Sequence, residues 1–269
     1  MAENLLGNNV TEFWKEVKAA NRAKTVLPCH IEGVSCAGNI AEQWRQHYAA
    51  LFNCIKSEPY CVGKLNEEVI HFTPNEVYHA IEQLADNKAS GKDNITAEHL
   101  KLASPRVAAL LSICLTGLMT HGILPDTLLT VILVPVIKGK AGKIGSLDNY
   151  RTIAFASILS KVLEKMLLDR LSELIFTTEN QFGFKCKHST DLCIYALKEA
   201  VESYRRQGST MLLGFIDASK AFDRVNPQKL FTKLMLRGVP GCIIRILDFW
   251  YTNQGMQVIW ETAYPHPSV

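Results

Sequence analysis

The feature that most constrains this chain is a short apolar run that ends at a carboxylate. Residues 211–216 read Met-Leu-Leu-Gly-Phe-Ile; Asp217 follows at once, and a second carboxylate, Asp223, stands six positions further on. A short, unbroken apolar run is typical of a β-strand that is buried on both faces. We therefore expect residues 211–216 to form such a strand, with Asp217 leaving the core to face a cleft. A carboxylate held rigidly at a strand end suits a hard cation such as Mg2+.

The local pattern also has a simpler interpretation. Two aspartates six positions apart are common on soluble proteins, so this stretch could be a strand-to-helix turn with solvated acidic side chains. The residues upstream have to decide between the two interpretations.

Composition sets limits on the function. With 269 residues, 48% of them hydrophobic and 20% charged, the chain is globular and large enough for a sizeable core. Its net charge of +3 is too small to mark the whole chain as a nucleic-acid binder. Positive charge is nevertheless in local excess, because residues 138–170 contain seven Lys and Arg but only three acidic residues. That patch would attract a phosphate backbone, or it is a solvated helix face with loosely paired charges.

Targeting signals and membrane spans are not expected. The first residues lack the basic start and the long apolar core of a signal peptide. The longest apolar run, residues 128–137, contains Pro135 and is too short to cross a bilayer. These observations predict an intracellular protein, nuclear or cytoplasmic and not secreted, with no membrane partner.

The cysteines do not have the spacing of a zinc site. Cys29 and Cys36, like Cys54 and Cys61, leave six residues between them. Structural zinc pairs usually leave two to four. We expect free, reduced and buried thiols instead.

The periodicity predicts a helix-rich chain. Ile40, Trp44 and Tyr48 recur at helical spacing and are expected to be core residues. Residues 24–38 are loop-like, and residues 88–95 form a turn that lacks the Walker phosphate-loop pattern. We also expect a helix that begins at Val10 and six further helices, at residues 97–103, 107–121, 158–175, 190–206, 226–237 and 241–251. Strands are expected at residues 131–137 and 256–260.

Five sequence blocks occur together and in a fixed order. They are a turn at Ser90-Gly91, residues 135–138, residues 149–161, residues 181–190 and residues 215–223. Together these blocks resemble the reverse transcriptases of non-LTR (LINE-type) retrotransposons. Residues 215–223 match motif A of that family, F-x-D-x-x-x-A-F-D. The chain departs from the family pattern at four positions: Ser90, Thr152, Phe155 and Lys185.

The resemblance implies a fold. It is an α+β fold, helix-rich with a small, mostly antiparallel sheet, that corresponds to the fingers and part of the palm of a right-hand polymerase. Residues 1–85 would be a helical lead-in, and residues 86–269 the fingers and an incomplete palm without a thumb. After motif A the family continues with Gln-Gly-x-x-x-Ser-Pro and Tyr-x-Asp-Asp, whereas the given sequence contains no adjacent aspartates.

The resemblance also implies an activity and a set of site residues. The activity is RNA-templated DNA synthesis, with Mg2+ as cofactor and an RNA template, a DNA primer and deoxynucleoside triphosphates as partners. Asp217 would be the catalytic carboxylate and would ligate the metal together with the Ala218 carbonyl. The other implied contacts are Lys138, Arg151, Lys161 and Phe222 for the nucleotide, and Lys185, Lys187 and His188 for the template, with Asp223 of second rank.

One carboxylate is too few for this chemistry. A single aspartate cannot position two divalent ions, so we expect negligible polymerase activity from the chain alone. Two alternatives stay open: a nucleic-acid-binding module without chemistry, and an inert, partly folded remnant of a retroelement. A metal-dependent nuclease has less support, because no cluster of His, Asp and Glu accompanies Asp217.

Overall fold

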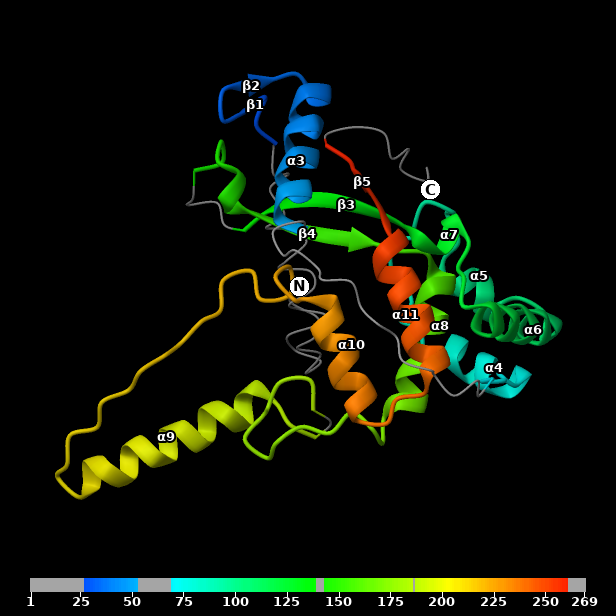
Figure 1. The fold of residues 1–269 in the computed structure, drawn as a ribbon. Coiled ribbons are helices and arrows are strands. Elements are labelled where there is room, and N and C mark those ends of the chain that lie inside the picture. Colours follow the sequence, from blue (N-terminus) through cyan, green and yellow to red (C-terminus); the bar gives the residue numbers. More distant parts are fainter. Residues whose placement is uncertain (1–26, 53–68, 139–142, 186, 261–269) are drawn as a thin grey trace, which may run out of the picture. The chain divides into compact units, whose positions relative to one another are not determined.

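The computed structural model describes residues 27–52, 69–138, 143–185 and 187–260 (Figure 1). The chain divides into two compact units. Residues 1–45, 134–153 and 258–269 form the first unit, and residues 46–133 and 154–257 form the second. The helix expected at Val10, Cys54 and Cys61, the side chain of Cys186 and the tail after Trp260 lie outside the described residues.

The first unit contains a small hairpin. Strands β1 (His30–Ile31) and β2 (Val34–Ser35) pair in antiparallel fashion within the stretch that was expected to be a loop. Glu32 and Gly33, which connect them, have φ angles of 48° and 82°. Two successive positive φ values define the type I′ turn that matches the twist of a hairpin. The Glu32 amide donates to the Gly145 carbonyl at 2.8 Å, which ties this hairpin to residues 143–149.

An aromatic cluster forms the interior of the first unit. Helix α3 (Ala37–Phe52) supplies Trp44, whose ring lies 5.2 Å from Tyr150 and 6.0 Å from Trp260, and the last two rings are 5.6 Å apart. The Tyr150 hydroxyl donates to the Ile144 carbonyl at 2.8 Å. Burial raises the pKa of that hydroxyl. The prediction that Ile40, Trp44 and Tyr48 are core residues is confirmed, since all three are buried.

The sheet is small, and the fold is α+β as expected. Three strands pair in the order β4-β3-β5: β3 (Thr130–Ile137), β4 (Tyr150–Phe155) and β5 (Gly255–Val258). A single 3-10 turn, η1 (Leu147–Asn149), precedes β4. Two of these strands were expected at nearly these positions, residues 131–137 and 256–260.

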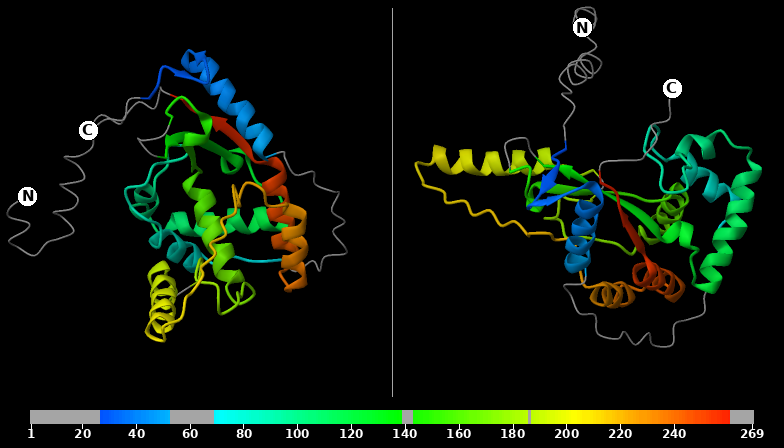
Figure 2. Two further views of the ribbon diagram at one scale, coloured as in Figure 1. Left: turned by 90° about the vertical axis from the view of Figure 1, so that its left-hand side faces the viewer. Right: turned by 90° about the horizontal axis from the view of Figure 1, so that it is seen from above.

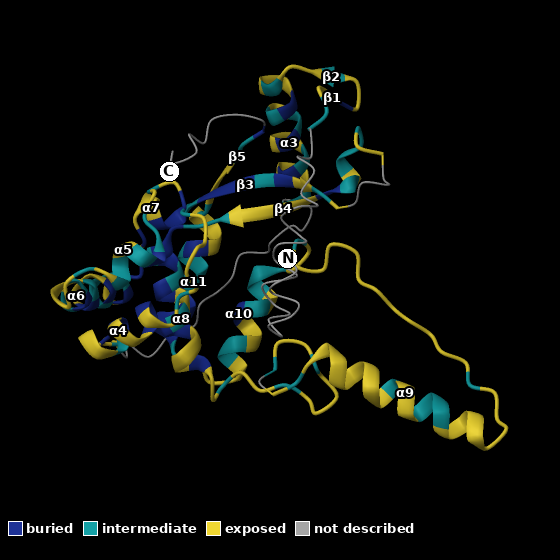
Figure 3. Ribbon diagram, turned by 180° about the vertical axis from the view of Figure 1, so that it is seen from behind, coloured by how far each residue is buried: buried dark blue, intermediate teal, exposed yellow. Residues whose placement is uncertain are grey.

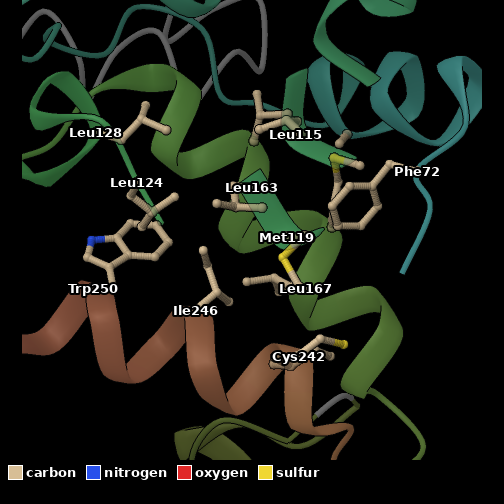
Figure 4. Close-up of a cluster of buried hydrophobic side chains, with 14 of the residues drawn as sticks. Phe72, Leu115, Met119, Leu124, Leu128, Leu163, Leu167, Cys242, Ile246 and Trp250 are labelled. Atoms are coloured by element: carbon tan, nitrogen blue, oxygen red, sulfur yellow. The ribbon is translucent and has the colours of Figure 1, made fainter. Parts of the chain in front are cut away.

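Helices build the core of the second unit. These are α4 (Pro74–Glu82), α5 (Ala97–Lys101), α6 (Arg106–His121), α7 (Asp126–Leu129), α8 (Ile158–Leu171), α10 (Pro227–Leu236) and α11 (Gly241–Asn253). Helix α4 packs on α6 and α8, and α11 packs on α6 and α10. Figure 2 shows α10 and α11 side by side in both views. In Figure 4, Leu163 and Leu167 of α8 point toward Met119 of α6 and Ile246 of α11.

Helix α8, which was expected over residues 158–175, buries one apolar face. Its buried positions include Val162, Leu163, Met166, Leu167 and Leu171, and the Ser157 side chain caps its start by accepting from the Leu159 amide at 3.2 Å. The helix ends at Leu171, four residues before the expected end.

A tight turn fixes the start of α8. Gly91 lies against the backbone just before α8. A Cβ atom on residue 91 would be only 2.7 Å from the backbone nitrogen of Ser157. The Ser157 hydroxyl donates to Asp93 at 2.5 Å, and Asp93 also accepts from the Ile95 amide at 3.2 Å. The glycine is therefore needed for close approach of two backbone segments, and the Gly91-Lys92 pair has a packing role.

A capping box fixes the start of α4. The Glu76 amide donates to the Thr73 hydroxyl at 3.2 Å, and the Thr73 amide donates back to the Glu76 carboxylate at 2.8 Å. Arg170 of α8 reaches the other oxygen of the Glu76 carboxylate at 2.5 Å. Burial by itself would raise the pKa of Glu76, but the hydrogen bonds from Thr73 and the Arg170 charge outweigh it and lower that pKa.

Residues 211–216 do not form the strand that we expected. They carry no regular secondary structure and are exposed except for Met211, with Phe215 80% and Ile216 101% exposed. Helix α9 (Thr190–Arg206), which precedes them, has no buried residue, and Figure 3 shows the helix and the following segment largely in the colour of exposed residues. A strand needs neighbours on its edges and both faces, and no described strand pairs with this segment.

The cysteines are free, but most of them are not buried. Of the cysteines that the structure describes, Cys242 is buried, whereas Cys29, Cys36, Cys114 and Cys193 are exposed. The expectation of free thiols is confirmed for these five, and the expectation of burial is wrong for four of them. No helix among the described residues combines the length and apolarity that crossing a membrane would require.

Replacing Gly91 by alanine should destabilise the second unit. The added Cβ cannot be accommodated without moving backbone, so we expect a loss of roughly 1–3 kcal/mol in the free energy of unfolding, measured by urea denaturation. Gly117→Ala in α6 is the matched control, since nothing lies within 4 Å of its Cβ position. That control should stabilise by up to about 1 kcal/mol because alanine favours a helix. Equal effects of the two variants would contradict the packing role of Gly91.

The contribution of Glu76 to stability should depend on pH. A carboxyl whose pKa is lowered by folding stabilises the protein above its ordinary pKa, and this contribution is lost as the pH falls through the folded value. The unfolding free energies of the wild type and Glu76→Gln should therefore differ more at pH 7 than at pH 3. Glu82→Gln is the control, because it removes a charge from the same helix without touching Thr73 or Arg170. A gap that stays constant with pH would contradict this role of Glu76.

Amide hydrogen exchange should distinguish the exposed segment from the core. Residues 211–216 make no backbone hydrogen bond in the described part of the chain, so their amides should exchange at nearly unprotected rates. Amides of α8 should be among the slowest. Mass spectrometry of exchanged peptides measures both, and slow exchange over 211–216 would restore the buried strand that the sequence predicted.

Candidate functional site

Asp217 lies in the open and is not held at a strand end. Asp217 and Ala218 are both exposed, and Asp217 makes no hydrogen bond or ion pair within the described residues. The turn that follows is closed by backbone bonds from the Arg224 amide to the Lys220 carbonyl, 3.2 Å, and from the Val225 amide to the Phe222 carbonyl, 3.3 Å. These bonds fix the chain after Asp217, and the Asp217 side chain itself is exposed.

Asp223 stands within the same turn. It is half-buried and forms no ion pair with the neighbouring Arg224 in the described part of the chain. The simple interpretation in which these two side chains neutralise each other therefore has no support.

The structure brings Phe222 together with a second predicted block. The Phe222 ring meets the Phe184 ring edge to face, with centroids 5.9 Å apart. Both rings are largely exposed, Phe222 at 77% and Phe184 at 93%. Phe184 lies within the block at residues 181–190 but was not among the predicted site residues. Its contact with Phe222 joins two segments that the resemblance treated separately.

The residues assigned to the template lie in one turn before α9. The Lys185 ammonium donates to the Thr178 carbonyl at 3.3 Å, and the His188 amide donates to the Lys185 carbonyl at 3.2 Å. The His188 ring lies 5.6 Å from the Phe182 ring. Lys187 is exposed, with a φ of 61°. Lys185 and His188 thus help to hold the turn, while Lys187 presents its charge to solvent.

Lys161 lies half-buried on α8, one turn before Glu164. Glu164 as a residue is exposed, but neighbouring protein atoms partly desolvate its carboxyl group. This desolvation raises its pKa, and the positive charge of Lys161 offsets the effect only in part. Glu164 borders a hollow of about 330 Å3 whose other lining residues come from α11 and its end: Leu247, Trp250, Tyr251 and Gln254. Lys165 instead faces Asp169, with nitrogen and oxygen 3.7 Å apart.

Lys138 and Arg151 belong to the first unit. The Lys138 ammonium donates to the Asp148 carbonyl at 2.6 Å, and its amide donates to the Asn149 carbonyl at 2.8 Å. Lys138 therefore closes the loop between β3 and β4. Arg151 is exposed on β4 and has no ion-pair partner among the described residues.

The described residues do not fit a two-metal centre. Reverse transcriptases use divalent metal ions, which stabilise the attacking and leaving oxygens of nucleotidyl transfer. Among the residues that the structure describes, no group of three or more His, Cys, Asp or Glu side chains could hold a metal ion. We therefore derive no catalytic step through a metal at Asp217.

Comparisons with known proteins identify the kind of domain. Residues 138–267 match the family model described as reverse transcriptase (RNA-dependent DNA polymerase). This range contains every predicted site residue, from Lys138 to Asp223.

Related proteins in fruit flies agree with that match. A probable RNA-directed DNA polymerase from transposon BS of Drosophila melanogaster is 27% identical over 199 residues, which cover 72% of this chain and 22% of the relative. The RNA-directed DNA polymerase from mobile element jockey of Drosophila funebris is 26% identical, over 66% of this chain and 20% of the relative. A probable polymerase from transposon X-element of Drosophila melanogaster is 28% identical, over 60% and 18%.

The chain spans about a fifth of the length of these curated relatives. The family match is consistent with the α+β fold, and it covers four of the five sequence blocks either wholly or from Lys138 onward; the Ser90-Gly91 turn lies outside it. The chain therefore carries a reverse-transcriptase-like domain: residues 138–267 match the reverse transcriptase family model, and the chain is similar to RNA-directed DNA polymerases of retrotransposons.

Proposed function

We propose that this chain provides the fingers and part of the palm of an RNA-directed DNA polymerase, preceded by a helical lead-in that ends near residue 85. The observation that supports this proposal is the family match, because its range, residues 138–267, includes all the predicted contact residues. The partners in this proposal are an RNA template, a DNA primer and deoxynucleoside triphosphates.

Each predicted residue has a role in this proposal. Asp217 and the Ala218 carbonyl would ligate Mg2+, and Phe222 would lie under the sugar of the incoming nucleotide. The cations divide into two groups: Lys138, Arg151 and Lys161 for the nucleotide, and Lys185, Lys187 and His188 for the template, while Asp223 stays in second rank.

The exposure of Asp217 argues against catalysis by the isolated chain and leaves nucleic-acid binding as its role. A solvated carboxylate keeps its hydration shell and its freedom of rotation, so it cannot fix two ions roughly 4 Å apart. Exposed cations on a surface, by contrast, attract a polyphosphate without any assembled pocket. We therefore propose that the isolated chain binds nucleic acid but does not extend a primer.

Primer extension tests the catalytic half of this proposal. The purified chain with Mg2+ or Mn2+, a primed RNA template and all four deoxynucleoside triphosphates should give no template-dependent product. Asp217→Ala, assayed in parallel, should give the same baseline as the wild type. Extension by the wild type that Asp217→Ala abolishes would show that a catalytic centre does assemble, and the proposal of inactivity would be wrong.

RNA binding tests the other half. Arg151→Ala should weaken binding of a fluorescent RNA, and Asp217→Ala should leave it unchanged or strengthen it slightly by removing a negative charge. Arg151 is a cleaner test than Lys138, because the Lys138 ammonium also holds the loop before β4. If the folded wild type binds no RNA at low salt, the chain is better described as the inert remnant.

A further inference from the structure

A basic pocket lies at the start of α10, and none of its lining residues is among the predicted site residues. Its volume is about 420 Å3, and six residues line it: Arg224, Val225, Asn226, Lys229, Leu230 and Lys233. We call it the α10 pocket. Three of these six side chains are cationic, and none is a carboxylate.

The charges of the α10 pocket are not compensated. In the part of the chain that the structure describes, the charged groups of Arg224, Lys229 and Lys233 make no ion pair and no hydrogen bond. Other cations of the same unit do have carboxylate partners, as Lys101 has Asp86 and Arg170 has Glu76. Three like charges around one hollow repel each other, so an anion that enters relieves this repulsion.

Local structure fixes the positions of these cations. Lys229 and Lys233 are four residues apart on α10 and therefore project from the same face, about one helical turn from each other. The Asn226 side chain accepts from the Lys229 amide at 3.0 Å and so anchors the start of the helix. The backbone bond from the Arg224 amide to Lys220 holds Arg224 in the turn beside them.

The remaining lining residues indicate the kind of anion. Val225 and Leu230 give the pocket apolar surface next to the cations. A small inorganic anion would use only the charges. A nucleotide unit uses both, since its phosphate takes the cations and its sugar or base covers the apolar side chains.

We propose that the α10 pocket binds the backbone of a single-stranded polynucleotide, with Lys229 and Lys233 as phosphate contacts and Arg224 beside them. This inference rests on the proposed nucleic-acid binding and adds to it a contact that lies outside the resemblance-derived residues. It identifies the phosphodiester backbone as the recognised group, a chemistry that RNA and DNA share.

Fluorescence anisotropy with the full chain tests the inference. The probes are a labelled 16-nucleotide RNA and a DNA of the same sequence, each titrated at several salt concentrations. Replacing Lys229 and Lys233 together by glutamine should weaken binding about tenfold at 150 mM salt. It should also reduce the slope of log affinity against log salt by about 1.4, because each phosphate contact on a single strand contributes about 0.7.

Two further variants make the result specific. The double variant Arg106→Gln with Lys198→Gln removes the same two charges from exposed positions on α6 and α9, and it should change the affinity less than twofold. The double variant Lys229→Arg with Lys233→Arg keeps the charges and should bind like the wild type. Urea denaturation of each variant confirms that the fold is retained.

The outcomes separate this inference from the proposed function. The wild type could bind the probes while the α10 double glutamine variant and the control double glutamine variant weaken binding equally. That result would overturn the role of the α10 pocket but leave the proposed nucleic-acid binding intact. A wild type that binds neither probe would overturn the proposed function together with the pocket. A loss confined to the α10 variant supports the pocket, and comparing RNA with DNA then shows whether the sugar matters.

Discussion

The core of the second unit depends on the side chains that helix α8 buries. These side chains, among them Leu163 and Leu167, share one hydrophobic cluster with side chains of α4, α6 and α11. Burying such side chains contributes about 1.5–3 kcal/mol each, which is a large part of the stability of a unit this size. The Gly91 turn and Ser157 fix the start of this helix.

The charged residues divide by what surrounds them. Glu76 and Arg170 join two helices of the core, and Lys138 closes a loop, so these charges act within the fold. Arg151, Lys187 and the cations of the α10 pocket point to solvent without described ion-pair partners. Charges of the second kind stabilise the folded state little, and they are the ones available to a phosphate backbone.

Asp217 shows that a matching sequence motif does not by itself establish the geometry of a catalytic site. The motif places a carboxylate and an aromatic ring five residues apart, but catalysis needs that carboxylate held beside others in a pocket with little water. In the described residues, Phe222 has a ring partner in Phe184, whereas Asp217 belongs to no group of three or more His, Cys, Asp or Glu side chains that could hold a metal ion. The polymerase resemblance is therefore secure at the level of the domain, while the roles of single residues stay proposals.

The sequence by itself determined most of the helices and the resemblance to reverse transcriptases. Ser157, Ser189 and Asn226 cap helices close to the predicted starts, because capping depends only on a side chain and the next few amides. Only the tertiary structure decided the state of residues 211–216, the hairpin contact of Glu32 and the meeting of Phe184 with Phe222. An apolar run becomes a buried strand only when other segments cover its faces and pair with its edges, and those neighbours are not encoded within the run itself.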